Sequence, residues 1–469
     1  MTRTAGSIDE LRASLAGVVF TPQDPDYDQA RLLWNADADR RPEVVARCSS
    51  AADVAAALRY AQAEGLEIAV RCGAHSMSGQ SGVDGGLVVD LSGMREVTVD
   101  PERRRARAGG GALISDLDAA TQAHGLGVPT GMVGHTGIGG LTLGGGMGWL
   151  SRQAGLACDN LESVEIVVAD GRILRASADE NADLFWAVRG GGGNFGVVTE
   201  FEYRLHDVGP MIQFAFLFWE VERGHEALRA IREAVAALPR SCNVIFGGLS
   251  APPAPFVPAE HRFKAGFALM IAGFGNPEEH TEAVERARAA LPPLFDTVTP
   301  MPYTALNQMF DQANCWGQYY YEKSTRYAEL TEDVIDVLVE HLPRRTSPMS
   351  VMLSYRLDEA YCEADPEATA FGGTRDPQYV TFVIAITPDG EALASERAWS
   401  RGVVDALQPL ALDAGTYVNG MTEQDDRRVR AAYGAKYDGL ARIKAEYDPG
   451  NVFHRNINIK PAVTEPPSK

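Results

Sequence analysis

The sequence HTGIGGLTLGGGMGWLSRQAGLACDNL, residues 135–161, is the stretch that says most about the fold, because glycines gather in it. A second segment, GAHSMSGQSG at 73–82, has the same character. Glycine has no Cβ, so its backbone N–H can come close to a ligand such as a pyrophosphate. Both segments are predicted to be loops beside strands, where tight turns also use glycine. Taken alone, the pattern favours ligand binding and simple turns equally.

A third glycine-rich run, GGGNFG at 191–196, matches the GxGxxG pattern of dinucleotide-binding folds. That fingerprint must follow a strand and open a helix. Here a predicted helix, ADLFWAV, precedes the run and a predicted strand, VVTEF, follows it, so a Rossmann fold is excluded. No lysine directly follows a glycine, which excludes the GK pair of a P-loop. The closest histidines, His124 and His135, are eleven residues apart and there is no GxSxG motif, so neither a helical zinc motif nor a nucleophile elbow is expected.

The composition is that of a soluble globular protein of two or three domains. The chain has 469 residues, of which 45% are hydrophobic and 23% charged. Its net charge of -20 disfavours nucleic acids and anionic membranes as partners. Six scattered cysteines without a CxxC motif indicate free thiols. The N-terminal residues lack the apolar run of a signal peptide, and no run of ~20 apolar residues occurs, so a cytoplasmic protein is expected.

The predicted elements divide the chain into three regions and indicate an α+β fold. Residues 1–206, with a core at about 38–206, alternate short strands with helices, such as the helix at 51–63, and contain hairpins at 96–108 and 164–177. Residues 207–414 carry longer strands and intervening helices, which is typical of an antiparallel sheet backed by helices. Residues 415–469 contain one predicted helix, at 427–446, and the segment DPGNVFHRNINIKP.

Four segments resemble one flavoprotein family in their order and spacing. They are RCGAHSMSG (71–79), residues 135–161, DLFWAVRGGGGNFGVVTEF (183–201) and NVFHRNINIKP (451–461). Together they resemble the vanillyl-alcohol-oxidase and p-cresol-methylhydroxylase superfamily, and within it the berberine-bridge-enzyme-like FAD-linked oxidases, especially the bacterial branch related to 6-hydroxynicotine oxidase. The resemblance implies an FAD-binding domain at 1–206, a substrate domain at 207–414, and a C-terminal segment at 415–469 that returns to the FAD domain.

The resemblance also implies that FAD is bound covalently. In the family, the histidine of a G-G/A-H-S loop bonds to the 8α-methyl group of the flavin, and His75 holds this position. A neutral imidazole nitrogen is a nucleophile near pH 7, which suits that bond. Some relatives add a second bond from a cysteine six residues before the GG of their glycine motif. Val133 occupies that position here, so a single bond is expected, and Cys158 is expected to be a buried thiol.

Further contacts to FAD are implied for the glycine-rich loops and the C-terminal segment. The implied contacts are Arg71, Gly73, Ala74, His75, Ser76, Gly79, Gln80, Thr136, Gly139, Gly140, Gly144 and Val198. Asn456 and Asn458 match the polar residues of the family's N-Q-N-I motif, which approaches the flavin ring. Ile457 replaces the central glutamine of that motif.

The implied reaction is hydride transfer from a substrate C–H to flavin N5, while a base takes the proton of the adjacent O–H or N–H. Oxygen would then reoxidise the flavin and yield hydrogen peroxide. In several relatives the base is an acid or a tyrosine on a strand of the substrate domain. The best-matching strand, at 378–386, carries no acid, so Tyr379 is its candidate. The segment YYYEKS at 319–324 adds Tyr320 and Glu322.

Tyr417 and Asn419, in the segment TYVNG, are candidates to line the substrate pocket. The sequence does not identify the substrate. The expected reaction is compatible with sugars, phenolic or terpenoid alcohols, alkaloid amines and polyketide intermediates. Two alternatives remain open. The chain could be a flavin dehydrogenase or oxidative cyclase that uses another electron acceptor, or a non-catalytic flavin-binding protein that keeps the fold.

Overall fold

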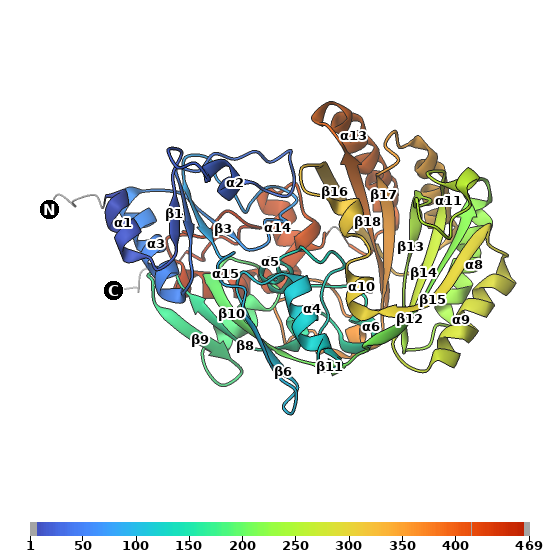
Figure 1. Cartoon of the computed structure of the whole chain (residues 1–469), viewed down its shortest axis with the longest axis horizontal. Coiled ribbons are helices and arrows are strands. Elements are labelled where there is room, and N and C mark those ends of the chain that lie inside the picture. Colours follow the sequence, from blue (N-terminus) through green and yellow to red (C-terminus); the bar gives the residue numbers. More distant parts are fainter. Residues whose placement is uncertain (1–6, 414, 464–469) are drawn as a thin grey trace.

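The computed structural model of the chain describes residues 7–413 and 415–463, which form two domains side by side (Figure 1). The α+β architecture expected from the sequence is confirmed. The expected domain boundaries at 1, 414 and 469 fall on residues outside the described ranges. Among the described residues, no helix combines the length and apolar character needed to cross a membrane.

The first domain opens with a mixed sheet whose strand order is β1 (Val18–Phe20), β2 (Val44–Arg47), β4 (Leu87–Asp90) and β3 (Ile68–Arg71). β2, β4 and β3 run parallel, and helix α3 (Ala51–Glu64) packs on them. This helix confirms the one predicted at 51–63 and ends one residue later. Ser50 accepts a hydrogen bond from the backbone N–H of Asp53, and Gly65 ends the helix in the left-handed conformation, which suits glycine.

A second sheet of the first domain, the hairpin sheet, is antiparallel. Its order is β5 (Val97–Asp100), β6 (Arg105–Gly109), β10 (Val197–Arg204), β8 (Leu161–Val167) and β9 (Ile173–Ser177). Both predicted hairpins are confirmed as β5–β6 and β8–β9. The run at 191–196 lies between helix α7 (Ala182–Val188) and β10, which confirms that it is no Rossmann fingerprint. Helix α4 (Ile114–Gln122) packs on the same core, and short helix α5 (Ile138–Leu143) forms where the sequence predicted only a loop.

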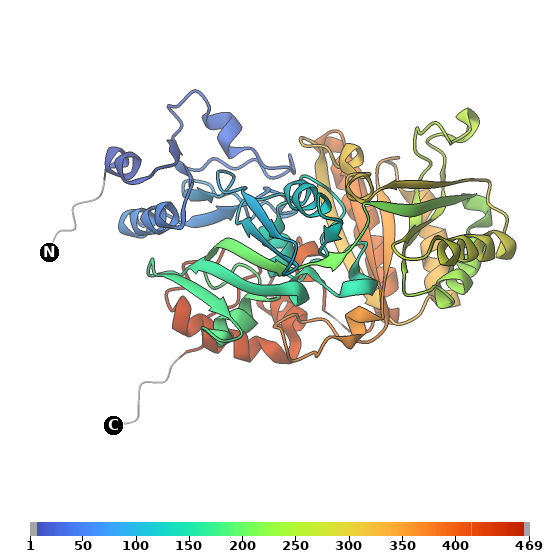
Figure 2. The same ribbon diagram turned by 60° about the horizontal axis from the view of Figure 1, so that its bottom comes forward.

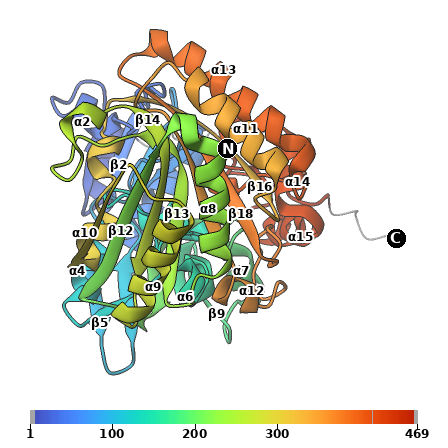
Figure 3. The ribbon, with the colours of Figure 1, turned by 90° about the vertical axis from the view of Figure 1, so that its right-hand side faces the viewer.

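The second domain is built on a large antiparallel sheet. Its order is β15 (Phe295–Pro302), β12 (Met211–Glu220), β14 (Ala265–Gly273), β13 (Cys242–Ser250), β17 (Val351–Leu357), β18 (Gln378–Thr387) and β16 (Tyr319–Tyr327). Its outer face is covered by α8 (Gly224–Ala236), α9 (Pro277–Ala290), α11 (Glu332–His341) and α13 (Gly390–Leu407), as Figure 3 shows. Its other face turns toward the first domain, so alternate residues of each strand meet different surroundings.

The C-terminal residues return to the first domain, where α14 (Asp426–Tyr433) and α15 (Tyr437–Tyr447) lie below the hairpin sheet in Figure 2. Tyr433 and Leu440 pack into its core. The single helix predicted at 427–446 is wrong, because Gly434 adopts φ 54° and ψ -135° and breaks it. The remaining short α-helices and strands are α1 (Ile8–Ser14), α2 (Tyr27–Arg31), β7 (Leu126–Gly127), α6 (Ser151–Ala154), β11 (His206–Asp207), α10 (Tyr303–Asn307) and α12 (Ala360–Glu363).

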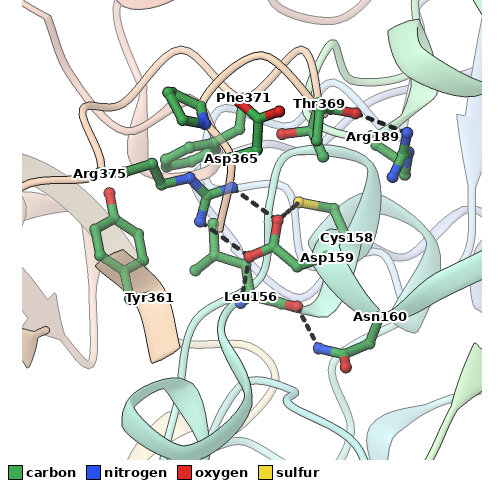
Figure 4. A network of polar contacts seen from close by, with 12 residues as sticks. Leu156, Cys158, Asp159, Asn160, Arg189, Tyr361, Asp365, Thr369, Phe371 and Arg375 are labelled. Atoms are coloured by element: carbon green, nitrogen blue, oxygen red, sulfur yellow. Dashed lines mark hydrogen bonds and ion pairs between the residues drawn. The ribbon is translucent and has the colours of Figure 1, made fainter. Parts of the chain in front are cut away.

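A buried ion pair joins the two domains. The guanidinium of Arg375, from the loop before β18, donates to both carboxylate oxygens of Asp159 at 2.7 and 2.9 Å, and Figure 4 shows the two groups facing each other. Arg375 also lies over the rings of Tyr361 and Phe371. The side chain of Arg375 is 5% exposed and that of Asp159 is 11% exposed, so each depends largely on the other for compensation of its charge.

The ion pair generates a stability prediction. Replacing Asp159→Asn leaves the guanidinium of Arg375 buried without its counter-charge, which costs about 3–5 kcal/mol and lowers Tm by several degrees. Thermal unfolding followed by circular dichroism measures the change. The matched control is Asp170→Asn, which breaks an exposed pair with Arg172 and should cost less than about 1 kcal/mol. Equal shifts in the two variants would contradict the prediction.

Candidate active site

A cavity of about 410 Å³ lies where the two domains meet. The glycine-rich loops, the start of β10 and the C-terminal segment line it from the first domain, and β16, β17 and β18 line it from the second. Its volume falls in the range of sites that bind small molecules and cofactors.

Two backbone segments with almost no space between them form one wall of the cavity. A Cβ built on Gly73 would lie 2.2 Å from the backbone nitrogen of Gly137, and a Cβ on Gly137 would lie 2.3 Å from that of Gly73. Only glycine allows this approach. The packing brings the segment at 73–82 against the segment at 135–161, although some sixty residues separate them in sequence.

His75 lies at the junction of these two segments and lines the cavity. Its Nε2 is 2.6 Å from Nδ1 of His135, and its Nδ1 is 3.4 Å from Oγ1 of Thr136. The ring of Trp34 stacks on the imidazole at 4.4 Å. Burial, with a smaller effect from His135, lowers the pKa of His75 to about 3. The imidazole is therefore neutral near pH 7 and retains a nitrogen lone pair.

Most of the residues expected to contact FAD line this cavity. These are Gly73, Ala74, His75, Ser76, Gln80, Thr136, Gly139, Gly140, Val198 and Asn456. Val133 also lines the cavity. It holds the position at which some relatives are expected to carry the cysteine of a second bond to the flavin. Cys158 is a buried thiol outside the cavity, as expected, whereas Cys72, which the sequence analysis did not single out, does line it.

Four residues expected to contact FAD lie elsewhere: Arg71, Gly79, Gly144 and Asn458. The Arg71 guanidinium donates to the carbonyl of Ala30. A Cβ on Gly144 would lie 2.0 Å from Oδ1 of Asn419, so this glycine makes room for a side chain of the returning segment. The structure therefore gives Arg71 and Gly144 roles in packing around the cavity.

The cavity has the features that FAD requires. A Cβ built on Gly140 or on Gly193 would have no atom within 4 Å, so the backbone of each residue faces open space. Nε2 of Gln80 and Oδ1 of Asn456 are buried without a hydrogen-bond partner in the protein. Buried polar atoms are rarely left unpaired, so both indicate a polar ligand. Ile457 also lines the cavity, in place of the glutamine of the family motif.

Of the three candidate bases, Tyr379 and Tyr320 do not line the cavity. Tyr379 points to the helix-covered face of the large sheet, where it stacks on Tyr327, because residues of β18 alternate between the two faces. Tyr320 lies behind Trp34, stacked on it at 3.7 Å, and its hydroxyl donates to the carbonyl of Cys315 at 2.7 Å. Both phenols are used in packing, so the structure does not support them as bases.

Glu322 is the one carboxylic acid among the described residues that line the cavity. It stands on β16, is buried, and shares this wall with Phe382 and Tyr355. Burial raises the pKa of Glu322 to about 8, because the surrounding protein solvates its charged form poorly. A carboxyl group with such a pKa can both accept and release a proton near neutral pH.

Tyr417, on the returning segment, is another polar residue that lines the cavity. Its hydroxyl oxygen accepts hydrogen bonds from the backbone N–H of Gly146 and from Nδ2 of Asn419, both at 2.9 Å. Both lone pairs are then engaged, so the hydroxyl proton is free to be donated. Burial raises the pKa of Tyr417, and the nearby carboxyl of Glu322 adds to this shift. The sequence named Tyr417 only as a candidate lining residue.

Two family descriptions match the chain: an FAD binding domain over residues 42–177 and a berberine and berberine-like region over residues 416–460. The (R)-6-hydroxynicotine oxidase of Paenarthrobacter nicotinovorans is 31% identical over 96% of this chain and 97% of its own length. The chain belongs to the berberine-bridge-enzyme-like family of FAD-linked oxidoreductases. It is therefore an oxidoreductase that binds FAD, and the non-catalytic alternative is set aside.

Solved structures agree with this assignment. The crystal structure of 6-hydroxy-D-nicotine oxidase from Arthrobacter nicotinovorans has a TM-score of 0.84 and 27% identity, and the match covers 96% of this chain and 99% of that one. Glucooligosaccharide oxidase from Acremonium strictum, with a TM-score of 0.84 and 22% identity, covers 97% of this chain and 100% of its own and shares the fold. Its FAD is described as 6-S-cysteinyl and 8α-N1-histidyl.

The raised pKa of Glu322 generates a prediction for the ligand-free protein. Its carboxyl binds a proton up to about pH 8 when folded and only up to its ordinary value of 4.5 when unfolded, so the free energy of unfolding falls as pH rises through this window. Glu322→Gln has no such group. At pH 9 the variant should melt several degrees above the wild type, and the difference should shrink toward pH 5.

Differential scanning calorimetry across this pH range measures the effect. Glu282→Gln, on the exposed side of α9, is the matched control and should leave the wild-type pH dependence unchanged. A constant offset between the wild type and Glu322→Gln at every pH would show that Glu322 does not titrate in this way.

Proposed function

We propose that the protein is an oxidase that holds FAD covalently through His75. It removes a hydride from a C–H beside an alcohol or amine of a small organic substrate, and oxygen takes the electrons to give hydrogen peroxide. The observation that carries this proposal is the presence of two groups in one cavity: the imidazole of His75 beside the glycine-rich loops, and Glu322, the one carboxyl group among the described lining residues. Burial lowers the pKa of the imidazole and raises that of the carboxyl group.

The division of labour follows from the positions of these groups. FAD, when bound, supplies the hydride acceptor. The loop glycines allow the backbone to contact the cofactor, and His75 anchors it. Glu322, in its ionised form, accepts the proton of the substrate O–H or N–H while negative charge develops there. Tyr417, with its hydroxyl proton free, donates to the same oxygen or to the carboxylate and so fixes its orientation.

The lining of the large-sheet wall favours a substrate with an apolar body. Leu353, Phe382 and Ile384 contribute hydrocarbon surface there, and Tyr355 adds a further aromatic ring. Arg455 is the one guanidinium among the described lining residues, and it is engaged with the carbonyl of Gly82 and with Glu67. Among the lining residues that the structure describes, an anionic substrate would meet Glu322 and no unpaired cationic side chain. Neutral or cationic aromatic alcohols and amines therefore fit better than acids or oligosaccharides.

The function is tested on the purified yellow protein. The intact mass should exceed that of the chain by one FAD less two hydrogen atoms, and acid precipitation should leave the colour with the protein. A panel of aromatic alcohols, alkyl amines and sugars is then screened for hydrogen peroxide. We expect peroxide with the apolar members, at rates at least tenfold above those with sugars, since unpaired substrate hydroxyls are costly to bury in an apolar pocket.

Two other results would change the proposal. Anaerobic bleaching of the flavin by a substrate without peroxide in air would favour a dehydrogenase or oxidative cyclase with another acceptor. Release of all the flavin by acid would remove the covalent bond to His75 from the proposal and leave bound FAD.

The base is tested separately from the tether. Glu322→Gln keeps the shape of the side chain and cannot accept the proton, so kcat should fall about 10²–10⁴-fold while covalent FAD is retained. Tyr417→Phe removes the free donor and should lower kcat by a smaller factor. The matched control is Tyr379→Phe on the opposite face of the sheet, which should leave kcat unchanged. Loss of activity in Tyr379→Phe, with Glu322→Gln active, would reverse the assignment.

A further inference from the structure

The contact between His75 and His135 is the shortest polar contact that His75 makes in the cavity wall. Nε2 of His75 and Nδ1 of His135 are 2.6 Å apart, and the two rings are tilted by 43°. At this distance one nitrogen must carry a proton and the other must accept it, because two lone pairs would repel and two protons would clash. The contact therefore decides which nitrogen of His75 keeps a free lone pair.

We propose that His135 is a positioning residue for the formation of the bond between His75 and FAD. It accepts the Nε2 proton of His75, which leaves the lone pair on Nδ1 to bond to the 8α carbon of the flavin. It then takes that proton away as the bond forms. This inference rests on the proposed covalent attachment of FAD.

The surrounding contacts hold both rings in place for this task. Trp34 stacks on His75, and its indole N–H donates to the carbonyl of Asn314 at 2.8 Å. The turn that carries His135 is anchored on both sides. The backbone N–H of Gly134 donates to Asp311 at 2.7 Å, and the carbonyl of Thr136 accepts from the backbone N–H of Ile114 at 2.9 Å. The second contact of His75, 3.4 Å from Nδ1 to Thr136, is too long to compete.

Burial explains why a proton acceptor is needed. An imidazole that bonds to carbon through one nitrogen while it keeps a proton on the other becomes a cation. The low pKa of His75, about 3, reports how poorly this site tolerates a positive charge on that ring. Transfer of the proton to His135 lets the bonded ring stay neutral.

The reaction balances as follows. One C–H bond of the flavin 8-methyl group and the N–H bond of His75 break, and one N–C bond forms. Two electrons and two protons, one of which passes through His135, end on the flavin ring. Dioxygen, the oxidant of the proposed function, takes both electrons and both protons to give hydrogen peroxide, and the ring returns to its oxidised state.

The test measures bond formation itself. Full-length protein produced under riboflavin limitation is mixed with FAD in air, and covalent product is followed by flavin fluorescence in denaturing gels and by intact mass. His135→Leu removes the proton acceptor. His135→Asn keeps an acceptor oxygen near the position of Nδ1 and cannot carry the proton away. We expect incorporation to be about 10–100-fold slower in His135→Leu, and His135→Asn to lie between it and the wild type.

Three controls separate this inference from the proposed function. His75→Ala should bind FAD without covalent attachment, and His124→Asn, an exposed histidine of the same domain, should incorporate FAD at the wild-type rate. If the wild type forms no covalent product, the proposed tether fails. If the wild type forms it and both His135 variants match its rate, the role of His135 is refuted while the tether stands.

Two further readouts would not respond to a merely structural role. His135→Asn should change the pH profile of the wild-type rate, because the group that faces Nε2 of His75 is then an amide that cannot bind a proton. Nuclear magnetic resonance of the isolated flavin peptide should show the bond at Nδ1. A bond at Nε2, or an unchanged pH profile in His135→Asn, would overturn the proposal.

Discussion

The close packing of two backbones at Gly73 and Gly137 is the constraint on which the site depends. Atoms of these residues come so near that a single added Cβ would collide with main chain, which cannot move aside as a side chain can. This contact brings His75 and His135 within hydrogen-bond distance and leaves the backbone of Gly140 open to the cavity. The glycines are therefore needed both for space to admit a cofactor and for the approach of the residues that would anchor it.

The side of the cavity that carries Tyr417 depends on the way in which the two domains are joined. Tyr417 reaches the glycine-rich loop only because the chain returns from the second domain to the first, and its hydroxyl is bound by Gly146. Gly144 makes room for Asn419, which holds the same hydroxyl. The ion pair between Arg375 and Asp159 secures this interface nearby. A change in the packing of the two domains would therefore displace Tyr417 and Asn419 more directly than the glycine-rich loops at 73–82 and 135–161.

Burial gives the cavity a consistent electrostatic character. It raises the pKa of Glu322 and of the Cys72 thiol, and it lowers the pKa of His75. All three shifts favour the uncharged form of the group. The cavity therefore presents few fixed charges near neutral pH, in keeping with the proposed apolar substrate and with the proposed role of Glu322 as the group that accepts a proton.

The sequence alone determined the features that depend on neighbours along the chain. Ser50 and Gly65 bound α3 and turn residues placed both hairpins, because capping and turn geometry are local properties. The glycine loops alone fitted turns and ligand binding equally, and it was the resemblance to a flavoprotein family that singled out His75 as the expected attachment point. Only the tertiary structure decided which face of each strand meets the cavity. It placed Tyr379 and Tyr320 outside the cavity and left Glu322 as the candidate base that lines it. It also brought His135 to His75. Strand alternation specifies two faces, and only packing between distant segments decides which face lines the cavity.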